Sequence, residues 1–444
     1  MSAKTGRITS FLHHAPLPVF TAFAIAASFS TYFCMYAFRK PFAAASFLDA
    51  DGNAIKFWSS AVDLKTALVI SQILGYALSK YIGIKVCSEV TRARRATMLI
   101  AMILLALAAL ILYGVLPEQW KFVGIFLGGL PLGMVWGLVV WYLEGRTVSE
   151  VLLAGLSCSF IVASGVVKDI GRHLMGDWGV TEGWMPAVTG GLFLIPFFIS
   201  VWLLNQLPRP TERDELARTH REPMRASDRA AFVRSFFWGL LLLVIAYFFL
   251  TAYRDYRDNY QVEMFAALDY PYDAHKTIIT KAETLVAFGV LVPLGLLFLI
   301  RNNRWGLIGT YAIMVCGLVI LGGSTWAMEN NHIDGFWWMT LVGLGAYLAY
   351  VPYGSVLFDR LMASTHVVGT AVFAIYIMDA LGYTGSVAVQ IYRDCLYADS
   401  AEPALGRLEF FIDFSYFMAG VGLLLLIGSC LYFLAKGRRK PQNA

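Results

Sequence analysis

The chain has 444 residues, of which 58% are hydrophobic, 15% aromatic and only 15% charged, and its mean hydropathy is +0.62. Soluble domains average about 25% charged residues, so the composition excludes a soluble globular protein as well as a disordered, collagenous or disulfide-based chain. The six cysteines form no CxxC pair, and we interpret them as packing residues. We see no metal-ligand cluster in the sequence and expect no metal or other cofactor.

Long apolar runs follow one another along the whole chain. A helix needs about 20 mainly apolar residues to cross a bilayer, so we predict an all-α integral membrane protein with twelve transmembrane helices. The first run is too long for a signal peptide, and no small-residue cleavage site follows it. The expected spans are residues 17–47, 63–86, 96–116, 120–143, 148–170, 184–206, 235–260, 275–300, 305–328, 335–358, 364–392 and 408–435.

Basic residues are distributed unevenly between the predicted loops. The segments assigned to one side of the membrane hold 21 Lys and Arg residues, against six on the other side. The positive-inside rule therefore predicts that both termini are cytoplasmic. Residues 207–234 hold seven arginines and three prolines, and we interpret them as a cytoplasmic linker between two six-helix bundles, residues 1–206 and 235–444.

The two predicted bundles resemble each other in sequence. With an offset of 215 residues, Tyr32 aligns with Tyr247 and Arg39 with Arg254. The second and eighth spans also share a Lys-Thr pair, and the fourth and tenth spans both end near an acidic residue. Matches in the same order along both halves indicate a parallel duplication, which is common among transporters.

Ionisable residues occur inside the predicted spans. Each costs roughly 2.5–3.5 kcal/mol on insertion scales and normally faces the bundle interior or a water-filled cavity. Helical spacing gathers many of them with tyrosines on single helix faces, a pattern typical of a polar cavity. These stripes are Tyr32, Tyr36, Arg39 and Ala43; Gln72, Tyr76 and Lys80; Ser157, Ser164 and Lys168; Tyr247, Thr251, Arg254 and Asp258; and Tyr376, Asp379 and Tyr383.

Arg39 and Lys40 are adjacent cations with no acidic residue within a helical turn, and Arg254 occupies the duplicated position. Such a group favours an anionic ligand, because the planar guanidinium binds phosphate or carboxylate through two parallel hydrogen bonds. Arg254 has an alternative, which is a local ion pair with Asp258 at i+4.

Residues 36–45 resemble the first-helix signature Y-x-x-R-K-x-F-A-x-A of the organophosphate:phosphate antiporters. This family of the major facilitator superfamily includes the bacterial glycerol-3-phosphate and hexose-phosphate exchangers. Residues 63–82 are similar to its second helix. The resemblance implies a major facilitator fold, with Arg39 and Arg254 gripping a substrate phosphate and with Tyr76 and Lys80 lining the same cavity.

The sequence also departs from that family. The family places a histidine in the middle of its fifth helix, where this chain has serines and a cysteine at residues 157–159. The loop motif between helices two and three is degraded, with Ser79 at its aspartate position.

We therefore predict a monomeric secondary active transporter of the bacterial inner (plasma) membrane that exchanges a phosphorylated metabolite for phosphate by alternating access. Its partners would be a small anionic solute, phosphate or a proton as coupling species, and the lipid bilayer, with no nucleic acid. The residues expected to bind substrate are Arg39, Arg254, Lys40, Lys80, Tyr76, Tyr36, Tyr32 and Gln72.

Other functions remain open at this stage. Mixed acids and bases in one cavity also suit a proton-coupled symporter of a sugar acid, amino acid or peptide. A non-transporting receptor or a membrane enzyme is a further class, although we see no nucleophile–base pair in the sequence and expect no enzyme.

Two groups of charges have alternative roles. Asp379 and Asp258 are candidates either for proton coupling or for charge pairing. The expected pairing partner of Asp379 is Lys80 or Gln72. A second group of charged residues lies at equal depth on spans five and eight, and we interpret it as an outer gate. The alternative is that these residues form interhelical ion pairs or are snorkelling lysines. The gate residues are Lys168, Asp169, Lys281 and Glu283.

Overall fold

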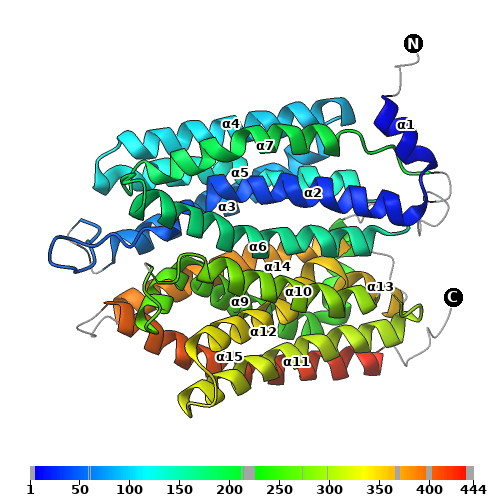
Figure 1. The fold of residues 1–444 in the computed structure, drawn as a ribbon. Helices are drawn as coiled ribbons and strands as arrows, with labels where there is room; N and C mark the ends of the chain where they lie inside the picture. The colour runs from blue at the N-terminus through cyan, green and yellow to red at the C-terminus, as the bar shows by residue number, and fades with distance from the viewer. Residues whose placement is uncertain are drawn as a thin grey trace. The chain divides into compact units, whose positions relative to one another are not determined.

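The computed structural model describes residues 6–58, 60, 62–211, 214, 226–272, 274–297, 299–365, 371–396 and 403–436. Within these residues the chain is α-helical, apart from two 3-10 turns and two isolated β-bridges (Figure 1). Residues 212, 213 and 215–225 of the predicted linker 207–234 lie outside the described residues, as does the side chain of Tyr376.

The chain forms two compact units. The first unit comprises Met1–Thr219 and Tyr272–Lys281, and the second comprises His220–Pro271 and Ala282–Ala444. The chain passes from the first unit to the second inside the segment that we interpret as a linker, and the separate piece Tyr272–Lys281 had no signal in the sequence.

Six long helices make up the first unit, together with the short helix α1 (Arg7–His14) and the 3-10 turns η1 (Pro41–Ala44) and η2 (Glu118–Trp120). The helix α2 lies between α6 and α7, as Figure 1 shows, and α3 packs along α5. The long helices are α2 (Leu17–Arg39), α3 (Leu64–Glu89), α4 (Arg92–Val115), α5 (Lys121–Leu143), α6 (Ser149–Gly176) and α7 (Met185–Leu204).

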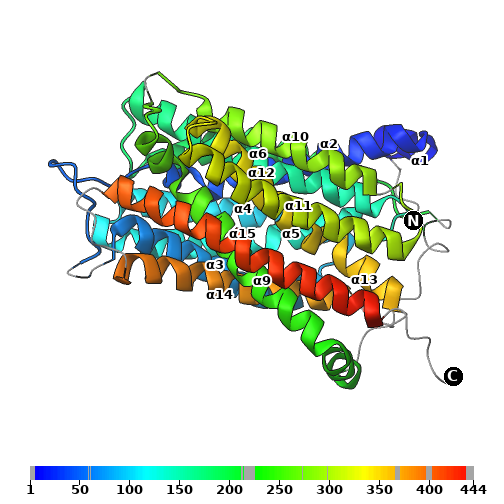
Figure 2. The same cartoon turned by 90° about the horizontal axis from the view of Figure 1, so that it is seen from below.

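Six further long helices and the short α13 (Leu357–Thr365) make up most of the second unit, although the first turn of α10 is counted with the first unit. The helix α9 packs against α14 and α15 (Figure 2). The long helices are α9 (Ala226–Ala267), α10 (Ile278–Leu297), α11 (Asn303–Glu329), α12 (Gly335–Ser355), α14 (Ala371–Leu396) and α15 (Pro403–Lys436).

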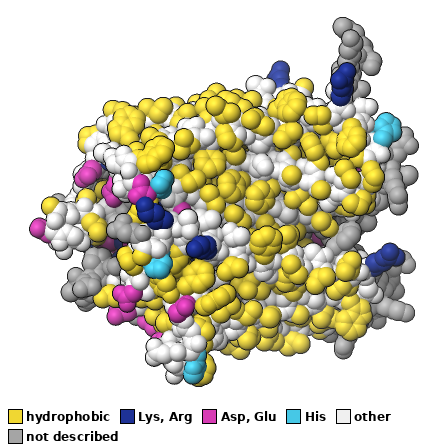
Figure 3. Space-filling model, viewed as in Figure 1, with side chains coloured by type: hydrophobic (Ala, Val, Ile, Leu, Met, Phe, Trp, Pro, Cys, Tyr) yellow, Lys and Arg dark blue, Asp and Glu magenta, His cyan; other side chains and the backbone are white. Residues whose placement is uncertain are grey.

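In the described part of the chain, nine helices are long and apolar enough to cross a membrane, or ten if α12 and α13 form one span bent by 54°. The helices α3 and α14, which carry Gln72, Lys80 and Asp379, are not among them. The chain is thus a multi-pass membrane protein, while the count of twelve spans stays a prediction. The face drawn in Figure 3 is covered by hydrophobic side chains along the helices, as contact with lipid requires.

The first helix ends earlier than its apolar run predicts. The expected span 17–47 is not continuous, because α2 ends at Arg39 and a 3-10 turn begins at Pro41. Proline has no N–H to donate to the carbonyl four residues before it, and its ring clashes with that carbonyl. Ala43 is therefore not on the α2 stripe with Tyr32, Tyr36 and Arg39, but is buried in η1.

Glycines bring helix backbones together in both units. A Cβ atom on Gly75 of α3 would lie 2.3 Å from the carbonyl oxygen of Phe126 on α5. In the second unit, a Cβ on Gly345 of α12 would lie 2.4 Å from the carbonyl oxygen of Gly317 on α11. Small residues at such crossings allow the close packing on which helix association in a membrane depends.

We expect Gly75→Ala to destabilise the first unit, because the added methyl group meets rigid backbone. Overpacking of this kind costs about 1–3 kcal/mol, which should lower the midpoint of thermal unfolding in detergent. The matched control is Gly191→Ala on α7, where an added Cβ meets nothing within 4 Å. Equal melting temperatures for the two variants would contradict the tight α3–α5 packing.

Candidate functional site

Arg39 is buried at the end of α2, with a relative exposure of 4%. Its guanidinium carbon lies 4.0 Å from the ring centroid of Tyr76 on α3 and 5.6 Å from that of Tyr36. One terminal nitrogen donates a hydrogen bond of 3.3 Å to the Tyr36 hydroxyl. Two aromatic rings thus stabilise the positive charge by cation–π interaction where little water reaches it.

The end of α2 itself adds to this stabilisation. The amide of Gln72 on α3 donates a hydrogen bond to the backbone carbonyl of Arg39, so the register between the two helices is fixed at the arginine. The C-terminus of a helix carries a partial negative charge, which favours a cation in its last turn. Lys40, the next residue, is also buried and ends α2 as its cap.

Tyr76 is the centre of the predicted residues in the first unit. The Nζ atom of Lys80 lies 5.5 Å from its ring centroid, and its hydroxyl lies 3.4 Å from the hydroxyl of Tyr32. The structure therefore brings together Arg39, Tyr32 and Lys80 around one ring, as the helical stripes on α2 and α3 predict.

An aromatic wall continues from Tyr32 across two further helices. Tyr32 meets Trp136 on α5 edge-on at 4.9 Å between ring centroids, and Trp136 lies 6.0 Å from Phe160 on α6. Sequence reasoning missed Trp136 and Phe160, because a single aromatic residue in an apolar helix has no signal that separates a contact inside the bundle from a contact with lipid.

Arg254 of α9 is buried in the second unit, and its surroundings differ from those of Arg39. Its guanidinium carbon lies 4.2 Å from the ring centroid of Tyr350 on α12. It also forms an ion pair of 2.5 Å with Asp255, whose other oxygen accepts a hydrogen bond of 2.7 Å from Ser386 on α14. The ion pair that the structure shows is therefore with Asp255, and not with the predicted alternative Asp258, which is buried on the same helix.

Asp379 of α14 is connected to this arginine through two tyrosines. The hydroxyl of Tyr247 donates a hydrogen bond of 2.8 Å to Asp379. The Tyr247 ring stacks on Tyr350 at 5.2 Å, and Tyr350 in turn faces Arg254. A carboxylate, two phenols and a guanidinium thus form a continuous chain across α14, α9 and α12.

Glu283 of α10 belongs to a second buried network of the same unit. It accepts hydrogen bonds from Arg257 at 2.8 Å and from Gln261 at 2.6 Å. Arg257 also donates to the carbonyl oxygen of Met339 at 2.7 Å. These contacts tie α9, α10 and α12 together inside the second unit, which corresponds to the ion-pair alternative for Glu283, with Arg257 as the partner.

The other residues of the predicted outer gate lie in the first unit. Lys168 and Asp169 are buried on α6, whereas Lys281 is exposed. Asp169 contacts Arg172 at 3.4 Å and Thr280 at 2.7 Å. The contacts shown for Asp169 and Glu283 thus involve partners that the prediction did not name.

The described residues include no group of three or more His, Cys, Asp or Glu side chains that could hold a metal ion. In the first unit, the polar side chains on α2 and α3 provide cations and phenols. In the second unit, those on α9, α12 and α14 provide a cation, phenols and the hydrogen-bonded carboxylates of Asp255 and Asp379. Groups of these kinds can bind a charged or hydroxylated solute.

The fold is that of membrane transporters of the major facilitator type. The crystal structure of a D-xylose-proton symporter is similar to this chain with a TM-score of 0.61 and 12% identity, covering 92% of this chain and 96% of that chain. A mutant of the nucleoside transporter NupG is similar with a TM-score of 0.55 and 13% identity, covering 94% of this chain and 99% of that chain. At such identity the likeness shows the fold alone.

The sequence matches a family of unknown function (DUF5690) over residues 41–436. The chain belongs to this family. A search of the curated proteins finds no match.

We expect Glu283→Gln to destabilise the second unit, because it leaves the Arg257 charge buried without its acidic partner. Breaking a buried pair in this way costs about 3–5 kcal/mol, which should lower the thermal unfolding midpoint. The exposed control Glu118→Gln should not change it. The double variant Arg257→Met/Glu283→Leu should recover part of the loss, and a double variant as unstable as Glu283→Gln would contradict the pairing.

Proposed function

We propose that the protein is a secondary active transporter of a small anionic solute that works by alternating access. The observation that carries the proposal is Arg39, a buried cation held by the rings of Tyr36 and Tyr76 at the end of a membrane helix. Ionisable residues are expensive inside a membrane and are normally retained for transport or pairing. The fold shared with solved transporters supports the same class.

The orientation of Arg39 suits an anion as ligand. A guanidinium that stacks on an aromatic ring has its face covered, while its N–H donors point outward in the plane of the group. A carboxylate or phosphate can therefore approach its edge while the stacking on Tyr76 persists. Lys40 and Lys80 add positive charge near the same place.

The finer proposal is a phosphorylated organic metabolite exchanged for phosphate, with Arg39 and Arg254 as a clamp. Closure of the two units around the solute would strengthen both contacts, so that the solute favours the closed state. The two arginines are not equivalent, because Asp255 already neutralises Arg254. Arg254 gains an anion only in competition with Asp255, and Arg39 binds the anion beside the rings of Tyr36 and Tyr76.

A second candidate is a proton-coupled symporter of a sugar acid, amino acid or peptide. The observation that favours it is Asp379, a carboxylate that accepts a hydrogen bond from Tyr247 and is linked through Tyr350 to Arg254. Protonation of Asp379 would remove its negative charge from this chain of contacts, which couples a proton to the arginine. In both versions we place the protein as a monomer in a bacterial inner membrane.

We expect Arg39→Lys and Arg254→Lys each to weaken solute binding. Loss of one charge-assisted hydrogen bond, worth about 1.5–3 kcal/mol, lowers affinity about 10- to 100-fold. The measurement is a thermal-shift screen of purified protein with phosphorylated metabolites, sugar acids and dipeptides, followed by titration of the hits. Arg304→Lys, at an exposed position, is the control. Unchanged affinity in both Arg39→Lys and Arg254→Lys would refute the anion clamp.

We expect Asp379→Asn to separate the two versions of the proposal in proteoliposomes. In a symporter, the variant should lose uptake driven by a pH gradient and keep solute counterflow, because asparagine cannot bind and release a proton. In a phosphate exchanger, uptake should require internal phosphate and should persist in the variant. Gradient-driven uptake that survives in Asp379→Asn would rule out this residue as the proton carrier.

A further inference from the structure

Four arginines gather at the end of the first unit where the chain leaves α7. Arg92 and Arg95 are in the first turn of α4, Arg146 is in the loop between α5 and α6, and Arg209 follows α7. The positive charges of Arg95 and Arg209 act on Arg92, and the charge of Arg92 acts on Arg146. We call these four residues the arginine cluster, in which like charges repel one another.

Backbone carbonyls hold three arginines of the cluster in place. Each side chain donates a hydrogen bond to a carbonyl near the end of α5 or just after α7. The pairs are Arg92 with Leu207, Arg95 with Trp141 at 3.1 Å, and Arg146 with Pro208 at 2.6 Å. These bonds fix the guanidinium groups without neutralising them, because a carbonyl oxygen accepts a hydrogen bond but carries no net charge.

The carboxylates near the cluster leave it with an excess of positive charge. The negative charges of Glu144 and Asp214 act on Arg95 and Arg146, respectively. Asp214, however, accepts hydrogen bonds from the backbone N–H and the hydroxyl of Thr147. In the part of the chain that the structure describes, no arginine of the cluster forms an ion pair with a carboxylate. Four cations beside two carboxylates therefore favour an anion from outside the chain.

Exposed tryptophans beside the cluster indicate that it lies at the membrane surface. Trp141 near the end of α5 is 40% exposed, and the guanidinium carbon of Arg95 lies 4.8 Å from its ring centroid. Trp202 near the end of α7 is 55% exposed. Tryptophans are enriched at the level of the lipid headgroups, because the ring is apolar and its N–H is polar. The cluster therefore lies at the depth of the headgroups.

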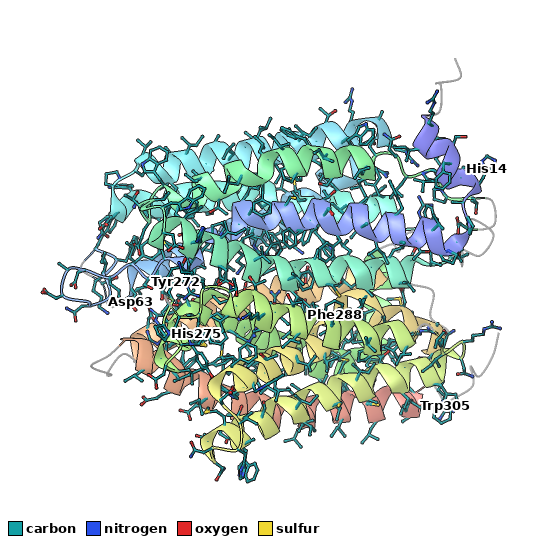
Figure 4. The ribbon with its side chains drawn as sticks, viewed as in Figure 1. His14, Asp63, Tyr272, His275, Phe288 and Trp305 are labelled. Carbon is teal, nitrogen blue, oxygen red and sulfur yellow. The ribbon has the colours of Figure 1, made fainter. Side chains whose placement is uncertain are left out.

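The short helix α1 lies at the same end of the first unit. The Thr9 hydroxyl donates a hydrogen bond of 3.0 Å to Gln206, which directly follows Asn205, the cap of α7. Figure 4 labels His14, the last residue of α1. Phe11 of this helix is 62% exposed. An exposed aromatic side chain on a short helix at the end of a membrane span is typical of a helix that lies on a lipid surface.

We propose that the arginine cluster binds the phosphate group of an anionic phospholipid. Guanidinium groups bind phosphate through parallel hydrogen bonds, and basic pockets between membrane helices are typical sites for anionic headgroups. The positive-inside rule predicts that this end of the unit is cytoplasmic, where anionic lipids attract basic residues. The site lies within the first unit, and it depends neither on the second unit nor on the proposed transport.

Free phosphate offers the same chemistry as the headgroup, but an apolar strip on α7 favours the lipid. Ile195, Ile199 and Trp202 are exposed and follow one another at helical spacing, so they share one face of the helix. This strip runs along α7 to the end where the cluster lies. The acyl chains of a lipid whose phosphate contacts the cluster would lie along the strip, whereas free phosphate would gain nothing from it.

The test titrates the purified full chain in detergent with phosphatidylglycerol and measures the lipid-bound fraction by native mass spectrometry. Arg95→Gln and Arg209→Gln should each lower the apparent affinity about fivefold, as expected for the loss of one basic residue near an anionic headgroup. Arg209 is exposed, so its substitution should leave the fold intact. The matched control is Arg301→Gln, which removes an exposed arginine of the second unit and should bind lipid like the parent protein.

Two further ligands test the chemistry of the site. Phosphatidylcholine carries a phosphate but no net charge, so it should bind more weakly than phosphatidylglycerol. Inorganic phosphate at the concentration of the lipid should leave the lipid bound. Equal affinities of Arg95→Gln, Arg209→Gln and Arg301→Gln, or equal binding of the two lipids, would overturn the site. Displacement of phosphatidylglycerol by inorganic phosphate would assign the cluster to free phosphate and would overturn the lipid as its ligand.

Discussion

The burial of positive charge in an apolar protein is the constraint on which the rest of the structure depends. An arginine removed from water needs protein groups to replace its hydration. Arg39 receives two aromatic rings and the end of its own helix, whereas Arg254 and Arg257 receive the carboxylates of Asp255 and Glu283. The contacts of each arginine also fix the helices that supply its partners. They therefore orient α2 against α3, and α9 against α10, α12 and α14.

The buried arginines of the two units have different partners, although the two halves of the sequence align at Arg39 and Arg254. The rings of two tyrosines lie against Arg39, and its neighbour Lys40 is a second buried cation. In the second unit, Asp255 follows Arg254 directly and neutralises it. The two arginines therefore have different surroundings, and an anion that reaches Arg254 must compete with Asp255.

Residues Tyr272–Lys281 pack within the first unit, although the chain on both sides of them belongs to the second. Three kinds of contact hold this segment to α6: an exposed ion pair, a buried helix cap and a ring against a glycine. The exposed pair is weak by itself, because water and salt screen it. The buried cap is stronger, since Asp169 would lose two short hydrogen bonds if this segment moved. The gate residues predicted from equal depth included Asp169, but the partner was Thr280, whose backbone N–H is invisible to an argument about charges.

The sequence by itself determined that this is a membrane protein built from successive apolar runs. It also determined two sets of residues that share a helix face, namely Tyr32, Tyr36 and Arg39, and Gln72, Tyr76 and Lys80. These features depend only on composition and on the helical period within one segment. The end of α2 at Arg39 also follows from the local sequence, because Pro41 cannot continue the helix, although the apolar run extends beyond it. Only the tertiary structure decided that Arg39 lies over the Tyr76 ring, that Asp255 pairs with Arg254, that Trp136 extends the aromatic wall and that Asp169 accepts hydrogen bonds from Thr280. These contacts join different helices, and their partners depend on the rotation and register of one helix against another, which no periodicity within a single helix specifies.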